Sequence, residues 1–163
     1  MGYLNPVLQF GVEKFCKRAS EVGISGVILP DLPMDECLSE YKNIFDQYNL
    51  LNIFLITPQT SEERIRMIDK HSKGFIYMVS SSSTTGAKAG IDDSQEKYFS
   101  RIKEMKLKNP LMVGFGISNK ISFETACEYA NGVIIGSAFI KAIETRNDLK
   151  KNVSDFVRIF LSR

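Results

Sequence analysis

Six short apolar runs alternate with longer amphipathic segments along this chain, and the alternation limits the folds that it can adopt. The runs are continuously apolar, as is typical of strands buried on both faces of a parallel sheet. Repeated β-α units joined by right-handed crossovers predict an α/β fold with such a sheet. The predicted strands cover residues 1–3, 26–29, 52–56, 75–79, 111–114 and 132–135.

The segments between these runs carry the spacing of amphipathic helices. In residues 12–22, apolar side chains recur three and four positions apart, which places them on one helical face. Ser61 is a suitable N-cap for a helix over residues 62–71, whose first turn carries two carboxylates. The predicted helices cover residues 12–22, 35–48, 62–71, 94–105, 118–130, 137–144 and 149–161.

The length of 163 residues predicts a single domain over residues 1–163. A complete (β/α)₈ barrel usually needs about 250 residues, with roughly 200 as a lower limit. The chain is therefore short for a closed barrel, and it has six β-α units rather than eight.

Charge and apolar runs exclude several classes of protein. The net charge of +2 comes with no cluster of Lys and Arg, which argues against a nucleic-acid surface. The sequence has no apolar run of about 18 residues and no N-terminal secretory pattern, so we expect a cytoplasmic protein that does not enter a membrane.

Cysteine and histidine offer no metal site by their spacing. Cys16, Cys37 and Cys127 form no C-x-x-C pair, and His71 is the single histidine, so we expect no zinc. We expect three reduced thiols that are buried or half-buried. His71 closes a predicted helix, where an exposed histidine stabilised by the helix dipole is the default.

The residues that follow the predicted strands are the candidates for a ligand site, because parallel α/β folds bind ligands there. Gly116 follows one strand, while Gly136 and Ser137 follow the last strand and open a short predicted helix. Backbone N–H groups at such a place favour a phosphate, although both glycines can also serve tight turns alone. The run Ser-Ser-Ser-Ser-Thr-Thr-Gly at residues 80–86 also follows a strand, and it is either a passive linker or part of the site.

Two further residues at strand ends and one inside a strand each allow two interpretations. Asp31 is the one carboxylate at a predicted strand end, and it either serves the site or caps a helix that starts near Met34. Tyr77 either bonds to a ligand or to a buried neighbour, and Tyr3 either faces the site or packs as an aromatic side chain. Acid and base steps usually need two titratable groups in one pocket, and this pattern supplies one.

Taken together, these motifs resemble the alpha subunit of tryptophan synthase. The matching motifs occur in the order and spacing of that family over nearly the whole chain. They are Gly-Tyr-Leu-Asn-Pro at 2–6, Gly-Val-Ile-Leu-Pro-Asp-Leu-Pro at 26–33, Phe-Leu-Ile-Thr-Pro at 54–58, Tyr-Met-Val-Ser at 77–80, Thr-Thr-Gly at 84–86, Val-Gly-Phe-Gly-Ile-Ser at 113–118 and Gly-Ser-Ala at 136–138.

The resemblance implies a lyase with a (β/α)₈ TIM barrel, here about six of eight β-α units. The family cleaves indole-3-glycerol phosphate to indole and glyceraldehyde 3-phosphate by a retro-aldol reaction. Indole then passes to the beta subunit in an alpha2beta2 complex. The alpha subunit carries no cofactor, since pyridoxal phosphate belongs to the beta subunit.

The resemblance also implies roles for single residues. The phosphate would be held by Gly86, Gly116, Gly136 and Ser137, with Phe115 at the same site through its backbone. The substrate pocket would be lined by Tyr3 and Tyr77, with Asp31 in support and Thr85 on a mobile loop that closes the site.

The family's acid–base pair, a Glu and an Asp, belongs to motifs that would lie before Met1, so the resemblance assigns no catalytic residue to this chain. Met1 itself would stand inside the third barrel strand. We therefore expect the first two β-α units to be missing, and the isolated chain to be unstable or inactive because its sheet cannot close. Two other interpretations stay open: another phosphate-binding barrel enzyme, and a non-catalytic protein that binds a sugar phosphate or a beta subunit.

Overall fold

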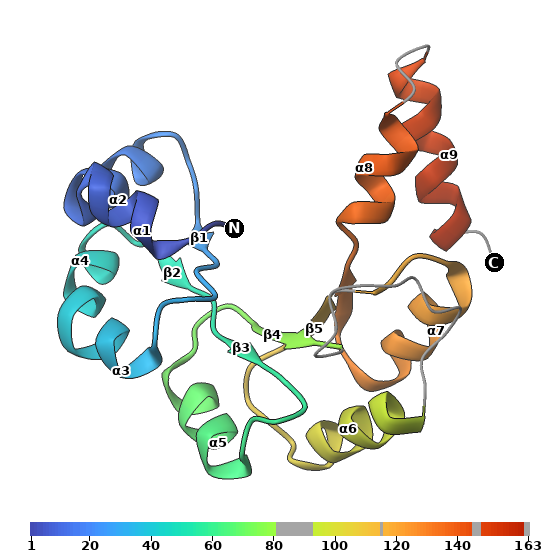
Figure 1. Ribbon diagram of the computed structural model, residues 1–163, viewed down its shortest axis with the longest axis horizontal. Coiled ribbons are helices and arrows are strands. Elements are labelled where there is room, and N and C mark those ends of the chain that lie inside the picture. The colour runs from blue at the N-terminus through green and yellow to red at the C-terminus, as the bar shows by residue number, and fades with distance from the viewer. Residues whose placement is uncertain (81–92, 115, 145–147, 162–163) are drawn as a thin grey trace.

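The chain folds into an open arc of parallel strands covered by helices. The computed structural model describes residues 1–80, 93–114, 116–144 and 148–161. The strands line the inner side of the arc, and helices lie along its outer side (Figure 1). The last two helices, α8 (Ser137–Ile143) and α9 (Leu149–Leu161), extend together beyond one end of the sheet. Among the described helices, none is long and apolar enough to cross a membrane.

Every pair of strands in the described residues is parallel, as predicted. Strand β1 (Gly26–Val27) pairs with β2 (Leu51–Asn52), and the four-stranded sheet has the order β3-β4-β5-β6. The strands of this second sheet are β3 (Leu55–Ile56), β4 (Ile76–Val79), β5 (Leu111–Gly114) and β6 (Gly132–Ile134). Neighbours along the chain are neighbours in space, as expected for consecutive β-α units.

The segment predicted as one strand over residues 52–56 serves both sheets as two short strands. Its first part pairs with β1, where the Ile53 N–H donates to the Val27 carbonyl at 2.9 Å. Its second part pairs with β4, where the Tyr77 N–H donates to the Phe54 carbonyl at 2.9 Å. One extended segment therefore joins the two sheets into a continuous arc.

The helices follow the predicted spacing, mostly with ends shifted by one or two residues. Helix α5 has the predicted bounds, and Ser61 caps it by accepting a hydrogen bond from the Arg64 N–H at 3.3 Å. Helix α7 begins two residues late, because Asn119 forms a capping box with Ser122. The bounds are α2 (Val12–Glu21), α5 (Glu62–His71), α6 (Asp93–Glu104), α7 (Lys120–Tyr129), α8 (Ser137–Ile143) and α9 (Leu149–Leu161).

The helix predicted over residues 35–48 is interrupted. It consists of α3 (Met34–Glu36), the π-helical turn η1 (Cys37–Tyr41) and α4 (Lys42–Gln47). A π-turn adds a residue to the local repeat, so it shifts the apolar face while the chain stays helical. Spacing of apolar residues at three and four does not reveal such a turn.

The prediction of a strand at the start of the chain is wrong. Met1 is 70% exposed, and residues 1–3 are extended but belong to no strand, so the structure does not place Met1 inside a barrel strand. The Gly2 N–H donates to the Ile28 carbonyl at 3.0 Å, beside β1. The chain then turns into a helix at Leu4, before further bonds of this kind could form a strand ladder.

That helix, α1 (Leu4–Phe10), is a second departure from the prediction. Asn-Pro usually indicates a turn, but Pro6 is the third residue of α1, where an N–H group has no intrahelical partner. Val7 is the buried side chain of α1 and belongs to the core. The dipeptide therefore starts a helix here rather than ending a strand.

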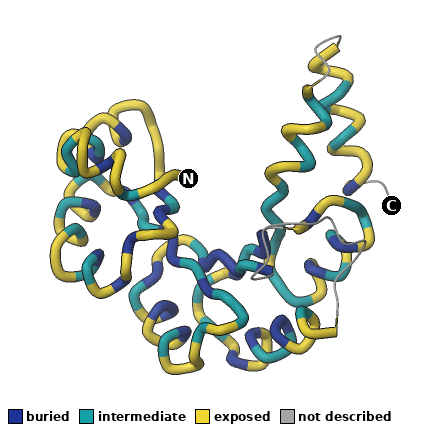
Figure 2. The backbone as a smooth tube through the Cα atoms, in the orientation of Figure 1, coloured by how far each residue is buried: buried dark blue, intermediate teal, exposed yellow. Residues whose placement is uncertain are grey.

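The core lies between the strands and the helices on the outer side of the arc (Figure 2). Its fully buried side chains include Ile56, Ile65, Ile76, Met78, Phe99, Ile102 and Val113. Helix α8 has no buried residue, and α9 buries only Phe160. A row of aromatic rings fixes this pair to α7, with centroid distances of 5.4 Å for Phe139–Phe156 and 5.3 Å for Phe123–Phe160.

Candidate functional site

Parallel pairing places the carboxyl ends of the six described strands at one edge of the arc. The segments that follow these ends therefore share one face of the molecule, as the sequence predicted. One closely packed part of this face lies at the ends of β4 and β5. It consists of Tyr77, Ser80, Gly114 and Gly116, and we call these four residues the β4–β5 cluster.

Tyr77 and Gly114 are matched in shape. Tyr77 is 3% exposed, and burial raises the pKa of its phenol above the ordinary tyrosine value. A Cβ atom on Gly114 would lie 1.9 Å from the Tyr77 Oη and 2.2 Å from Cζ. The ring therefore occupies the space that a side chain at residue 114 would need.

Ser80 and Gly116 form the outer half of the cluster. Ser80 is 1% exposed, and its N–H donates to the Gly114 carbonyl at 3.0 Å, which extends the β4–β5 pairing beyond Val79. Gly116 has a φ of +76°, a conformation that favours glycine, and a Cβ there would lie 3.5 Å from the Ser80 Oγ. The backbone after β5 thus turns sharply against Ser80.

Asp31 caps a helix, but a different one from the helix considered in the sequence. Both carboxylate oxygens accept from the Leu4 N–H at 2.9 Å, so Asp31 caps α1 across 27 positions of sequence. Helix α3, which starts at Met34, follows Pro33 and has no side-chain cap. The contact joins the β1–α3 loop to the start of the chain.

Tyr3, just before Leu4, is 70% exposed, so the interpretation as a packed aromatic is wrong. It lies beside the Asp31 contact at one end of the strand edge. Tyr77 lies farther along, on β4, and is separated from the chain's start by β1 and the segment 51–56. The structure therefore groups Tyr3 with Asp31, and Tyr77 with Ser80.

The last strand end carries Gly136 and Ser137. Gly136 precedes α8 with a φ of −104°, and no described residue lies within 4 Å of the position that its Cβ would take. Neither the conformation nor crowding by the described residues therefore requires glycine at 136. Three other predicted site residues, Thr85, Gly86 and Phe115, lie outside the described residues.

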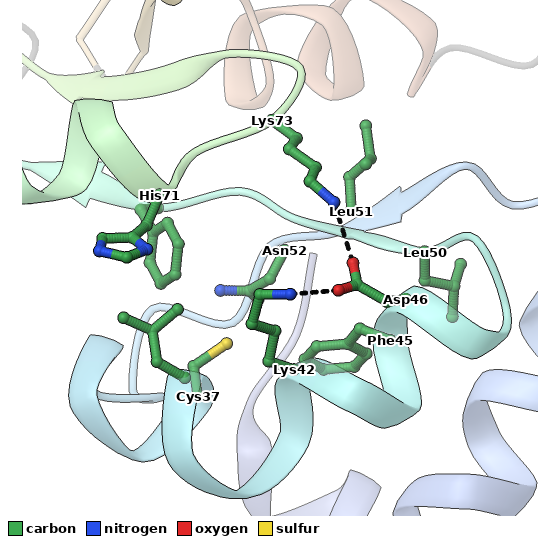
Figure 3. A pocket seen from close by; sticks show the side chains of 11 residues that line it. Cys37, Lys42, Phe45, Asp46, Leu50, Leu51, Asn52, His71 and Lys73 are labelled. Atoms are coloured by element: carbon green, nitrogen blue, oxygen red, sulfur yellow. Dashed lines mark hydrogen bonds and ion pairs between the residues drawn. The ribbon is translucent and has the colours of Figure 1, made fainter.

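A separate hollow lies at the opposite face of the arc. Figure 3 shows Lys42 and Lys73 both paired with Asp46, and the Lys73–Asp46 distance is 3.0 Å. Leu50 and Lys73 line this hollow and precede β2 and β4, so it sits at the amino ends of the strands. It is therefore distinct from the predicted ligand edge.

His71 and Cys37 also line this hollow. His71 ends α5 as predicted but is half-buried rather than exposed. Burial, with a smaller contribution from Asp46, raises the pKa of the Cys37 thiol to about 11. Cys16 is likewise buried, whereas Cys127 is exposed, contrary to the prediction.

One residue that contacts the strand edge does not appear among the sequence predictions. Gln95, in the first turn of α6, donates from Nε2 to the Ser80 carbonyl at 3.1 Å. No motif identifies it, because the contact joins residues 15 positions apart and depends on how α6 packs.

Among the described residues that follow the strands, Asp31 is the one carboxylate, and it accepts from the Leu4 N–H.

Comparison with known proteins gives one consistent family. The family model described as tryptophan synthase alpha chain matches residues 1–161. The tryptophan synthase alpha chain of Flavobacterium johnsoniae is 59% identical over 157 residues, which make up 96% of this chain and 61% of that protein. This chain therefore spans about three fifths of the length of that curated relative.

Solved structures agree with this result. The tryptophan synthase alpha subunit of Pyrococcus furiosus superimposes with a TM-score of 0.85 at 31% identity, covering 99% of this chain and 64% of that chain. A chain in the crystal structure of the tryptophan synthase complex from the same organism gives a TM-score of 0.83 at 30% identity, with the same coverage. The arc is thus part of a (β/α)₈ barrel, and the chain belongs to the tryptophan synthase alpha chain family.

Proposed function

We propose that this chain provides the substrate- and phosphate-binding part of a lyase that cleaves indole-3-glycerol phosphate to indole and glyceraldehyde 3-phosphate. The observation that carries the proposal is the family match over residues 1–161. The closely packed β4–β5 cluster lies at the edge where a barrel of this class binds its ligand.

In this proposal the phosphate is held by backbone groups at the ends of β5 and β6. Gly116 has the left-handed conformation that lets a turn present its backbone to an anion. Gly136 and Ser137 follow β6 at the same edge, and the Ser137 hydroxyl adds a donor. The family resemblance adds Gly86 and the backbone of Phe115 to this set.

The remaining substrate contacts would come from side chains on both sides of the cluster. Tyr77 offers a buried aromatic wall and a phenol hydroxyl, which suit an indole ring and a glycerol chain. Tyr3 would line the pocket from the start of the chain, with Asp31 as the support of that segment through the Leu4 N–H. Thr85 would belong to the loop that closes over the substrate.

Retro-aldol cleavage needs one group to protonate the indole ring carbon and another to accept the proton of the glycerol hydroxyl as the carbon–carbon bond breaks. Asp31 is already engaged as a helix cap. We therefore assign binding to this chain and propose that turnover requires a carboxylate pair from the rest of a complete barrel.

The complex from Pyrococcus furiosus supports a beta subunit as partner. In this proposal indole passes to that subunit, which uses pyridoxal phosphate, and the alpha chain itself works without a cofactor. The proposed setting is the cytoplasm, where amino-acid biosynthesis takes place.

The test compares two glycines that share a left-handed conformation. Alanine in place of Gly116 (φ +76°) or of Gly23 (φ +80°) should lower the free energy of unfolding by a similar amount, roughly 1–2 kcal/mol. Gly116→Ala should weaken binding of indole-3-glycerol phosphate, measured by calorimetry, whereas Gly23→Ala should bind as the wild type does.

Turnover is tested in the same samples by indole release. We expect none from the chain alone, and release once the N-terminal segment of the Flavobacterium relative is added. Binding without release in both mixtures would favour a non-catalytic binder. No binding to the wild type would contradict the proposed site.

A further inference from the structure

Ser80 is the point where the two strands of the β4–β5 cluster meet. Its N–H donates to the Gly114 carbonyl, and its Oγ faces the turn at Gly116. Ser80 is 1% exposed, so its side chain and backbone are packed against protein atoms rather than solvated. A displacement of Ser80 would therefore move both the end of β5 and the Gly116 backbone.

Within the described part of the chain, a side chain of α6 bonds to the Ser80 backbone. The Gln95 Nε2 donates to the Ser80 carbonyl at 3.1 Å, and Gln95 is half-buried. This bond uses the Ser80 carbonyl, whereas the pairing with β5 uses the Ser80 N–H. The Ser80 peptide groups are thus tied both to β5 and to α6.

Helix α6 is a rigid base for this contact. Its inner face buries Tyr98, Phe99 and Ile102. Arg101 donates from Nη2 to the carbonyls of Pro58 at 3.1 Å and Thr60 at 3.5 Å. The helix is therefore anchored to the core and to the turn after β3. Because Gln95 belongs to this anchored helix, its hydrogen bond restrains the position of Ser80.

We propose that Gln95 is a positioning residue for phosphate binding: its hydrogen bond to the Ser80 carbonyl fixes the ends of β4 and β5 and, with them, the Gly116 backbone. The inference rests on the proposed function, since it assumes that Gly116 contacts the phosphate. It adds a residue of α6 that need not touch the substrate.

The experiment uses the full chain, labelled with ¹³C and ¹⁵N, and glycerol 3-phosphate as the probe. Gln95→Met removes the donor but keeps the length of the side chain. Gln47→Met makes the same chemical change at an exposed position of α4 and is the matched control. Gln95→Ala is a second variant, because alanine favours helix formation and keeps the fold testable.

The wild type should bind the probe with a shift of the Gly116 amide signal. Both Gln95 variants should bind the probe more weakly, with a Kd raised about three- to tenfold, as expected for one lost hydrogen bond. Without the probe, the Ser80 carbonyl ¹³C signal should also move in these variants, which a general loss of stability would not cause. Gln47→Met should leave the Kd and the Ser80 signal unchanged.

Two outcomes overturn the inference, and they differ from each other. If the wild type binds and both Gln95 variants bind equally well, Gln95 has no positioning role, while the proposed function stands. If the wild type itself fails to bind glycerol 3-phosphate, the phosphate part of the proposed function fails and the inference fails with it.

Discussion

The Tyr77 phenol lies against Gly114 so closely that an added Cβ would come within 1.9 Å of the hydroxyl oxygen. Tyr77 is on β4, Gly114 ends β5, and the two strands are paired in parallel register. A substitution at either residue therefore changes the packing of the other. The contact fixes the shape of the strand edge where we place the substrate.

Gly114→Ala should therefore destabilise the chain by about 2–4 kcal/mol, because the buried ring has no free space to move into. The same substitution should cost less in a Tyr77→Ala background, with a coupling energy of about 1–3 kcal/mol. Urea unfolding of the four proteins measures this coupling. Additive effects would show that the ring moves aside without cost.

The cap on α1 gives a second prediction. Asp31→Ala should lower the free energy of unfolding by about 1 kcal/mol, as when an N-cap residue loses its hydrogen bond to a helix N–H, and should speed amide exchange in α1. Asp35→Ala is the control, because it removes an exposed ion pair with Arg64 that contributes little. Equal exchange in α1 for both variants would contradict the capping role.

The strand order and the start of α5 were predictable from the sequence, whereas contacts between distant residues were not. Continuous apolar runs and helical spacing predicted the parallel β-α order, and Ser61 predicted the start of α5, because these signals are local. The Asp31–Leu4 cap joins residues 27 positions apart. The local sequence around Asp31 therefore suggested a cap on the nearer helix, which starts at Met34. The Gln95–Ser80 contact likewise depends on the packing of α6 rather than on a motif.

Asp69 gives a prediction on pH. It is 8% exposed, and its carboxylate accepts from the Lys108 N–H, the Asn109 N–H and the Asn109 side chain. Burial alone would raise its pKa, but these hydrogen bonds outweigh burial and hold the pKa below the ordinary aspartate value. Because the folded-state pKa is lowered, this stabilisation is complete above the unfolded pKa and is lost as pH falls through the folded pKa.

Asp69→Asn should lower the free energy of unfolding at pH 7 by about 1–3 kcal/mol, since the amide cannot accept all of these bonds. The difference from the wild type should shrink as the pH falls below about 4, where the unfolded carboxyl is protonated. Chemical unfolding at several pH values measures this difference. A gap that stays constant down to about pH 2 would show that the charge of Asp69 is not involved.

The three cysteines should differ in reactivity. Cys16 and Cys37 are buried, and burial, aided by Glu13 at Cys16 and Asp46 at Cys37, raises both thiol pKa values to about 11. Cys127 is exposed on α7, so at about pH 8 a thiol reagent should modify one cysteine rapidly and the other two only on unfolding. Cys127→Ser should abolish the rapid phase, and mass spectrometry of peptides identifies the modified residue. Rapid modification of Cys16 or Cys37 in the folded chain would mean that α2 or η1 opens readily, because both thiols are enclosed by the core.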